Sequence, residues 1–331
     1  MKVSVVLPVF NGAQTIARAM GSILAQSLED LELIVVDDGS TDDTASVVAS
    51  ISDSRIRFEQ IEHSGVVVAA NHGTSLAKSP LIARMDADDF AYPQKLELQT
   101  KLMDERNFDV VGCQVRILNA DLDAAPSMDR YQQWINEETA ESEAITALRF
   151  VEFPLVNPTI LARRSYFELQ FKAGDYPEDY DLMLRAAEQG FRFGKVREVL
   201  FDWIDSPLGL TRSDPRYAEA AFMNCRRRHL LTGPLRGAHI VDLWGVGKKG
   251  KAWLRWLHAE TNIKVRHAYD VAERKVGETI HGVKVDHTDS LRPADEVPLL
   301  IAVGAANSRQ VILPQVVARG FRAGHDAWFV S

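Results

Sequence analysis

The sequence predicts an α/β protein with a mostly parallel, mixed sheet, followed by a second and smaller α/β domain. Strand-like and helix-like patterns alternate through the first hundred residues, which is typical of a sheet covered by helices on both faces. A stretch rich in glycine and proline around Gly233 then ends a helical pattern and indicates a linker. A new strand, glycine turn and helix follow it, so we expect domains at residues 1–232 and 238–331.

Short apolar runs and helical periodicity predict the individual elements. In the first domain we expect strands at residues 3–9, 31–36, 55–61, 81–85 and 110–117. The helices expected there are at residues 13–26, 44–51, 66–77, 179–188 and 217–231. The segment 121–142 is polar, and its pattern is less regular. In the second domain the pattern predicts strands at 239–244 and 263–270 and a helix at 250–260.

Composition limits the partners and the compartment. The chain has 331 residues and a formal net charge of -8, which disfavours a nucleic-acid partner. Cys113 and Cys225 have no metal-ligand or redox spacing, and no apolar stretch reaches the ~20 residues of a membrane span. We therefore expect a cytoplasmic protein. Contact of the basic residues 226–229 with the inner membrane face remains open, as does a homo-oligomer.

Three groups of side chains follow the first, second and fourth expected strands, where a parallel sheet binds its ligands. They are residues 8–11, 37–40 and 86–89. The last group has three carboxylates within four positions. Two unit charges 4 Å apart repel by about 4 kcal/mol at an effective dielectric of about 20. A divalent cation such as Mg²⁺ or Mn²⁺ would offset this repulsion, and its open coordination positions suit a diphosphate.

Each group also has a plain structural explanation. Residues 37–40 could be only a turn before a helix that Ser40 or Thr41 caps. The carboxylates of residues 86–89 could themselves cap a helix, although their mutual repulsion argues against it. Phe10 could be a core residue, and only its position at a strand end favours binding.

The motifs PVFNGAQTI, VVDDGSTDDT and RMDADD resemble, in that order and spacing, those of the family 2 glycosyltransferases with the GT-A fold. The resemblance covers residues 1 to about 230 and depends on several linked motifs. It implies inverting transfer of a sugar from a nucleotide diphosphate sugar to an acceptor hydroxyl, with Mn²⁺ or Mg²⁺. The motif Gln-x-x-Arg-Trp of processive synthases is absent from the sequence, which favours the addition of a single sugar.

The resemblance also implies roles for residues on the donor side. Phe10 matches an aromatic position near the base, and Asp38 matches a carboxylate that accepts a hydrogen bond from uracil, so UDP is the expected carrier. Asp88 matches the metal ligand, together with Asp86, and Asp89 matches a carboxylate behind them. The nucleotide-binding residues that the resemblance implies are Pro8, Phe10, Asn11, Asp38, Asn71 and Asp86.

On the acceptor side, the segment EDYDLMLR resembles the acidic start of the acceptor helix in this family. Asp179 is therefore the candidate general base, because an acceptor hydroxyl attacks well only if a carboxylate takes its proton. Glu178 and Asp181 are expected to position the acceptor. The plain explanation is that acidic residues stabilise the N-terminus of a helix.

Two departures from the family pattern keep other functions open. Ala70 stands where the family usually has an arginine that touches the nucleotide, and Ser206 stands where a histidine often completes the metal shell. The alternative is a non-catalytic sensor or scaffold that binds sugar nucleotides. For the enzyme, the expected acceptor is a saccharide, a lipid-linked saccharide or a protein, in the biosynthesis of a cell-surface polysaccharide.

The second domain carries a glycine turn of its own. Gly245, Gly247 and Gly250 follow an expected strand, and Asp270 lies at the end of the next one. In this context the pattern is typical of nucleotide-binding turns. The region resembles the small Rossmann-like domains of sugar-nucleotide acetyltransferases, which implies a nucleotide or sugar nucleotide as ligand. A purely structural or oligomerising role is the alternative.

Overall fold

The computed structural model describes residues 2–207, 209–305 and 307–331. The chain divides into two compact units: Met1–Ile145 with Pro154–Cys225, and Thr146–Phe153 with Arg226–Ser331. The second unit thus includes a short segment, Thr146–Phe153, that precedes the rest of this unit in the sequence. The domain boundaries expected from the sequence, at residues 1–232 and 238–331, stay a prediction.

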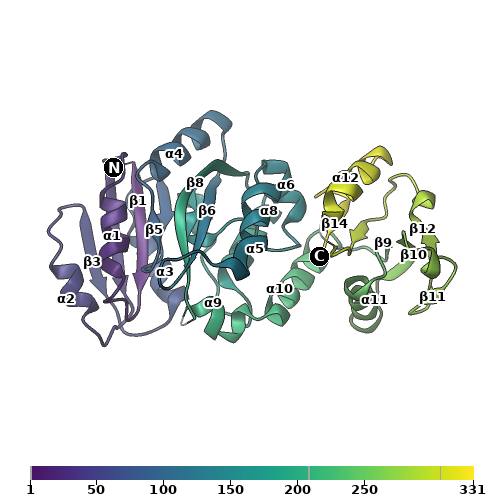
Figure 1. Ribbon diagram of the computed structural model, residues 1–331, viewed down its shortest axis with the longest axis horizontal. Helices are drawn as coiled ribbons and strands as arrows, with labels where there is room; N and C mark the ends of the chain where they lie inside the picture. Colours follow the sequence, from purple (N-terminus) through teal and green to yellow (C-terminus); the bar gives the residue numbers. More distant parts are fainter. Residues whose placement is uncertain (1, 208, 306) are drawn as a thin grey trace. The chain divides into compact units, whose positions relative to one another are not determined.

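The first unit is built on an eight-stranded sheet with the strand order β3-β2-β1-β4-β7-β6-β8-β5. Figure 1 labels β1, β3, β6 and β8 of this sheet. Its first four strands are parallel and lie side by side. They are β1 (Val3–Val9), β2 (Leu31–Asp37), β3 (Ile56–Gln60) and β4 (Leu81–Arg84). Every residue of β1, β2 and β4 is buried, as expected for parallel strands that helices cover on both faces. The connecting helices are α1 (Ile16–Leu24), α2 (Thr44–Ala49) and α3 (Val66–Leu76).

The other half of the sheet is mixed. Strand β7 (Leu161–Arg163) runs antiparallel to both β4 and β6 (Val110–Asn119), and β6 pairs in parallel with the long strand β8 (Phe193–Asp205). The short strand β5 (Phe90–Ala91) completes the edge, antiparallel to β8. Helices α4 (Lys95–Arg106) and α8 (Glu178–Glu188) belong to this half. The mixed, mostly parallel sheet confirms the predicted fold class, although β8 was not expected, because charged residues interrupt its apolar pattern.

The segment at residues 121–142, whose sequence pattern is less regular, folds into several short elements. The segment contains a 3-10 turn, the helix α5 (Asp129–Gln133), a π-helical turn η2 (Trp134–Glu138) and the start of α6 (Ser142–Leu148). Long-range bonds stabilise it: the Asn136 side chain accepts from the Val115 amide at 2.9 Å and donates to the Val115 carbonyl at 2.7 Å. Such contacts leave no periodic signal in the sequence.

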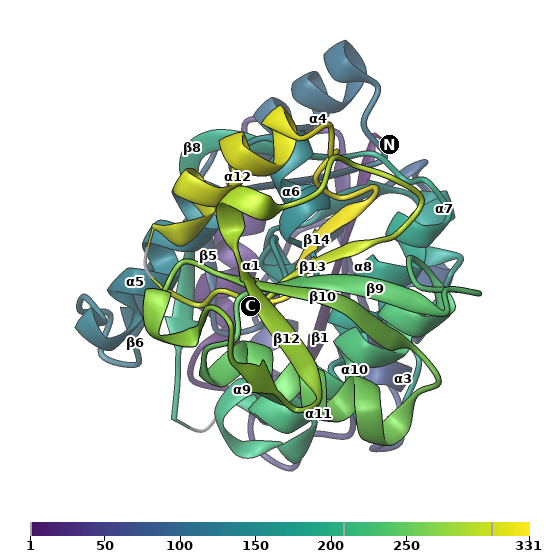
Figure 2. The same ribbon diagram turned by 90° about the vertical axis from the view of Figure 1, so that its right-hand side faces the viewer.

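The second unit has a six-stranded sheet with the order β11-β12-β10-β9-β13-β14. Figure 2 shows β9, β10 and β12 side by side. All its pairings are parallel except that of β11 with β12. The strands are β9 (Ile240–Trp244), β10 (Lys264–Asp270), β11 (Thr279–Ile280), β12 (Val283–His287), β13 (Leu299–Ile301) and β14 (Ala327–Phe329). The helices are α11 (Lys248–Glu260) and α12 (Ser308–Ala318), and α10 (Glu219–Thr232) ends just before the expected linker.

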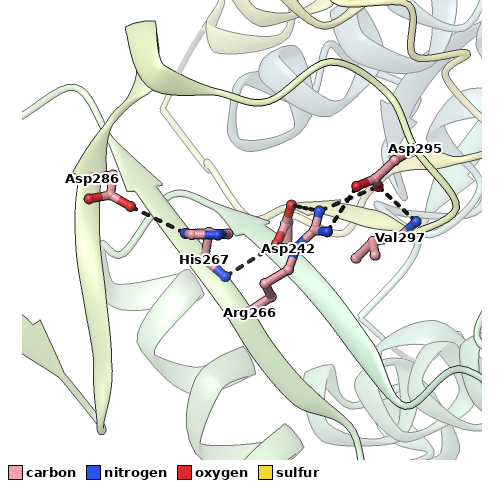
Figure 3. A network of polar contacts seen from close by, with 6 residues as sticks. All are labelled: Asp242, Arg266, His267, Asp286, Asp295 and Val297. Atoms are coloured by element: carbon pink, nitrogen blue, oxygen red, sulfur yellow. Dashed lines mark hydrogen bonds and ion pairs between the residues drawn. The ribbon is translucent and has the colours of Figure 1, made fainter.

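A charged network crosses this sheet. Arg266 on β10 pairs with the buried Asp242 at 2.7 Å and with Asp295 at 2.8 Å, and it lies between the two carboxylates (Figure 3). His267 lies 3.3 Å from Asp286 on β12. Because Asp242 is almost fully buried, its charge depends on this arginine.

The segment Thr146–Phe153 contributes to the core of the second unit. The guanidinium of Arg149 lies 4.5 Å from the ring centre of Trp328, and the Phe150 ring meets Trp328 edge-on at 5.6 Å. Arg226 donates a 2.6 Å hydrogen bond to the carbonyl of Val151. The buried rings near the C-terminus therefore pack on residues that lie almost two hundred positions earlier. Among the described residues, no helix is long and apolar enough to cross a bilayer.

Candidate active site

The loops after β1 and β2 are bonded to each other at the carboxyl edge of the sheet. The amide of Asn11 donates to the Ser40 hydroxyl at 2.8 Å, and the Asn11 side chain accepts from the Thr41 amide at 2.8 Å. Asn11 has a positive φ of 52°, a conformation that asparagine tolerates better than most residues. Pro8 lies inside β1, beyond the end of the pairing with β4, so its missing N–H removes no ladder bond there.

Phe10 and Asp38, which are predicted to bind the nucleotide base, both contact His63. Phe10 is 47% exposed and stacks on the ring of His63, with ring centres 4.1 Å apart. The buried carboxylate of Asp38 accepts from the amides of Ser64 and Gly65, both at 2.8 Å, and lies 3.0 Å from the Nδ1 atom of His63. Asp38 therefore also stabilises the loop that leads into α3. Its contact with a nucleotide base stays a prediction.

Asn71 has a defined structural role. Its side-chain amide donates to the carbonyl of Phe171 at 2.8 Å and accepts from the amide of the same residue at 2.9 Å. This pair of bonds ties α3 to the segment before α8. Its predicted contact with a nucleotide would come in addition to these bonds.

The plain explanations based on helix caps do not hold. Helix α2 begins at Thr44 after Asp43, so neither Ser40 nor Thr41 caps it. Helix α4 begins at Lys95, and the three carboxylates lead into β5 instead of a helix. The exposure of Phe10 likewise excludes it from the core. Residues 37–40 do form a turn, in which the Ser40 amide donates to Asp37 at 2.9 Å, but they do not cap the helix that follows.

The turn Asp86–Asp89 concentrates negative charge in a partly buried place. Burial, followed by the charge of Asp86, raises the pKa of Asp88 to about 6. Burial, followed by Asp88 and Asp86, raises the pKa of Asp89 well above its ordinary value. The Oδ1 atom of Asp89 accepts from the amide of Ile204 at 2.8 Å. Its Oδ2 atom is buried and has no hydrogen-bond partner among the described residues.

These carboxylates fit a divalent cation. Hard oxygen donors are what Mg²⁺ and Mn²⁺ prefer, and burial together with the neighbouring negative charges raises both pKa values, an effect that a cation would oppose. Two arginines balance this charge in part. Arg84 lies 3.0 Å from Asp86 in an ion pair, and Arg18 donates to the backbone carbonyl of Asp88.

The acceptor-side acids stand at the beginning of α8. The hydroxyl of Tyr217 donates to Glu178 at 2.7 Å, and Arg216 lies 3.8 Å from the same carboxylate. Burial, then Glu178, and in smaller measure Asp86 raise the pKa of the half-buried Asp179 to about 8. The charge of Asp86 therefore acts on Asp179, although 93 residues separate them in the chain.

Asp181 differs from its two acidic neighbours. It is buried and pairs with Arg185 at 2.7 Å one turn further along α8. Arg185 in turn donates to the carbonyls of Leu169 and Gln170. This geometry ties Asp181 to the scaffold behind the helix, and its expected contact with an acceptor stays a prediction.

Four residues of this site were missed by sequence reasoning. Arg84 stands inside the quoted motif RMDADD, so a signal for it existed. His63 is a single residue in a loop, Tyr217 ends the short 3-10 turn η4 (Pro215–Tyr217), and Arg18 is one of several basic helix residues. Nothing local in the sequence indicates their partners, which all lie at least 25 positions away.

The glycine turn of the second unit is tightly built. Gly245 has a φ of +98°, and a Cβ atom on Gly250 would lie 1.7 Å from the carbonyl oxygen of Gly245. Helix α11 begins at Lys248, two residues before the expected start, so Gly250 lies in its first turn and Gly247 precedes it. The expected start was wrong because glycine is a poor helix former, while the close approach to the turn requires it here.

Asp270 closes the same turn. Its carboxylate accepts from the amides of Val246 and Ala272, both at 2.9 Å, and pairs with Lys275 at 2.8 Å. Burial alone would raise the pKa of Asp270, but these hydrogen bonds outweigh it and lower the pKa. The acid expected to contact a ligand thus already stabilises the turn.

This geometry defines an α/β protein with a cluster of acidic side chains at the carboxyl edge of its main sheet. The model of glycosyl transferase family 2 matches residues 4–171, and that of a CoA binding domain matches residues 238–319. The chain belongs to glycosyltransferase family 2.

Individual relatives agree with this family. The succinoglycan biosynthesis protein ExoU of Rhizobium meliloti is 32% identical over 210 residues, which are 58% of this chain and 58% of that protein. The Escherichia coli protein WfgD, named as a UDP-Glc:alpha-D-GlcNAc-diphosphoundecaprenol beta-1,3-glucosyltransferase, is 35% identical over 35% of this chain and 47% of its own. The chain thus spans 58% of the length of ExoU and 47% of that of WfgD.

A solved structure shares the fold. Residues 1–349 of S. aureus TarS, crystallised with UDP-GlcNAc, superpose with a TM-score of 0.57 over 71% of this chain and 68% of that one, at 20% identity. At this identity the likeness concerns the fold alone.

Proposed function

We propose that this chain transfers a single sugar from a nucleotide diphosphate sugar to an acceptor hydroxyl, with inversion of configuration at the anomeric carbon. The expected carrier nucleotide is UDP. The observation that supports it most is the electrostatic coupling between Asp179 on the acceptor helix and Asp86 in the carboxylate turn. This coupling supports a base for the acceptor near a site for the donor phosphates. Family membership and the sugar-nucleotide relatives support the same reaction.

On the donor side, Asp86 and Asp88 would hold Mn²⁺ or Mg²⁺, with Asp89 behind them. When bound, the cation supplies positive charge that stabilises the departing diphosphate. Arg18 adds a further positive charge beside Asp88 and offsets part of the rise in the pKa of that carboxyl. Phe10 and Asp38 would contact the base at the neighbouring strand ends.

On the acceptor side, Asp179 takes the proton of the acceptor hydroxyl while the oxygen attacks the anomeric carbon. The bond from that carbon to the diphosphate breaks in the same displacement, and attack from the opposite side inverts the configuration. Burial and neighbouring acids bring the pKa of Asp179 to about 8, so it is a stronger base near neutral pH than an ordinary aspartate. Glu178, which accepts a hydrogen bond from the hydroxyl of Tyr217, would orient the acceptor.

The acceptor and pathway are proposed from relatives and chemistry. The names of ExoU and WfgD support a saccharide or lipid-linked saccharide as acceptor and the biosynthesis of a cell-surface polysaccharide. For the second unit we propose a nucleotide-containing ligand at the turn of Gly245 and Gly247. The CoA-binding match supports it, and so does the geometry that requires glycine at positions 245 and 250.

The test is a calorimetric screen of nucleotide diphosphate sugars with and without Mn²⁺, followed by assays of nucleotide release with and without saccharide acceptors. We expect one nucleotide sugar to bind in a metal-dependent manner and to release its nucleoside diphosphate faster when an acceptor is present. Binding without release over a broad panel of acceptors would contradict the proposal. It would favour the sensor or scaffold instead.

A further inference from the structure

A cluster of aromatic side chains lies next to the carboxylate turn. It consists of Tyr131 in α5, Trp134 in η2 and Trp203 near the end of β8. The residue after Trp203 is Ile204, whose amide donates to Asp89. Strands β5 and β8 pair antiparallel, with Phe90 opposite Asp202. Continuing this register by one residue places Trp203 opposite Asp89.

The rings of this cluster differ in exposure. The ring centre of Tyr131 lies 6.0 Å from that of Trp203 and 5.8 Å from that of Trp134. Trp134 is buried beneath, whereas Tyr131 and Trp203 are half-exposed. A ring that served only as core would be expected to be buried like Phe201, two residues away on the same strand. Two large aromatic surfaces therefore remain accessible beside a polar site.

The same cluster is connected to the acceptor-side acids. Arg212, in the short helix α9 (Leu210–Ser213), donates to Asp205 at 2.8 Å and reaches the sulfur of Met128 at 3.5 Å, just before α5. A few residues later the chain reaches Glu178 through the hydroxyl of Tyr217. One segment thus runs from the end of β8, beside the rings, to the start of α8, which carries Asp179.

We infer that Tyr131 and Trp203 form a stacking platform for a pyranose ring of the acceptor. This inference rests on the proposed function and specifies its substrate class. The C–H face of a pyranose is apolar and packs on aromatic rings, while its hydroxyls remain free for polar partners and for attack. The acceptor is accordingly a saccharide, or the terminal sugar of a lipid-linked saccharide.

The test compares Trp203→Ala, Tyr131→Ala and Trp203→Phe with the wild type, using octyl pyranosides as acceptors. Loss of a stacking ring should raise the acceptor KM roughly tenfold in either alanine variant, with a much smaller change in donor KM. Trp203→Phe should recover most of the loss, because it keeps an aromatic face. Val199→Ala, which removes an exposed apolar side chain from the same strand, should leave the acceptor KM unchanged.

Equal increases in donor and acceptor KM would overturn the platform, and so would an unchanged acceptor KM in a folded Trp203→Ala. If Trp203→Ala does not fold, the Tyr131→Ala and Trp203→Phe variants decide the matter by the same comparison. An effect that appears with octyl but not with methyl pyranosides would indicate an apolar chain as the occupant and would also overturn it.

Failure of the proposed function gives a different result. A wild type that neither transfers sugar nor hydrolyses any donor would contradict the transferase itself. The platform is then judged by saturation-transfer NMR with methyl pyranosides. Transfer to the ring C–H protons that is lost in Trp203→Ala supports it, and its absence in the wild type overturns it.

Discussion

Asp179 combines two properties that a general base needs. It stands at the start of α8, where backbone amides favour negative charge, yet burial and Glu178 raise its pKa to about 8. The charge of Asp86 adds to this shift, so the protonation of Asp179 depends on the donor side of the site. Asp181, two residues further along, pairs with Arg185 instead.

The first prediction is that Asp179→Asn lowers the kcat of transfer by about 10²- to 10⁴-fold, because the amide cannot take a proton. Donor affinity, measured by calorimetry, should change little. In the wild type kcat should rise with pH well above the range of an ordinary aspartate, since the base acts only when ionised; this limb should vanish in the variant. Full activity of Asp179→Asn would transfer the assignment to Glu178, whose Gln variant is the matched control.

The second prediction concerns the metal. Asp88→Asn removes one charge from the proposed cation site while keeping the size of the side chain. We expect the Mn²⁺-dependent part of UDP affinity to be lost and the metal-independent part to remain. Calorimetry with and without EDTA measures both parts. Asp109→Asn, which alters an aspartate in the same unit away from the turn, is the control; equal metal dependence in wild type and Asp88→Asn would exclude this ligand.

At the level of elements, the glycine turn of the second unit sets two effects against each other. Alanine is the better helix former by about 1 kcal/mol. A Cβ atom at Gly250, however, would lie 1.7 Å from a backbone oxygen that cannot move without opening the turn. The steric clash at Gly250 should therefore outweigh the gain in helix propensity.

The third prediction is therefore that Gly250→Ala destabilises the second unit by about 1–3 kcal/mol or more. Gly247→Ala is a matched control three residues away, because its added Cβ would meet nothing within 4 Å and its φ is not positive. Its cost should be about 1 kcal/mol or less, the usual size of a cap effect. Hydrogen exchange of the backbone amides of α11 measures the loss of stability in both variants. Equal protection in the two variants would show that the close approach is not rigid.

At the level of the whole molecule, accumulated charge links stability to pH. The folded protein raises the pKa of Asp88 to about 6 and of Asp179 to about 8, and it also raises that of Asp89. Unfolding lets these carboxyls ionise at ordinary values, so the folded state holds more protons between pH 4.5 and 6.5. Lys195 and Lys95, whose pKa values are lowered to about 7 and 8, act mainly above this window.

The fourth prediction is that, without metal, unfolding in urea becomes easier by roughly 2 kcal/mol as pH rises from about 4.5 to about 6.5. A raised carboxyl pKa contributes stability below the ordinary pKa and loses it as pH approaches the folded value. Added Mn²⁺ should oppose this loss, and increasingly so at higher pH, because it favours the ionised carboxylates. Stability that rises over this window, or no effect of Mn²⁺, would contradict the prediction.

The sequence by itself determined the local features. The strands β1, β2 and β4 and the helices between them follow from apolar runs and periodicity, which are properties of neighbouring residues. The acids at their ends could be assigned to one edge because parallel strands end together. The glycine turn before α11 could also be recognised from the sequence, because its residues lie within one short stretch.

Only the tertiary structure decided what depends on distant partners. Strand β8 forms although charged residues interrupt it, because β6 pairs with it along ten positions. The effect of Asp86 on Asp179, the bond from Tyr217 to Glu178, and the aromatic pair of Tyr131 with Trp203 join residues 39 to 93 positions apart. Burial and proximity of this kind arise from the packing of whole elements, and they carry no local pattern that a sequence could display.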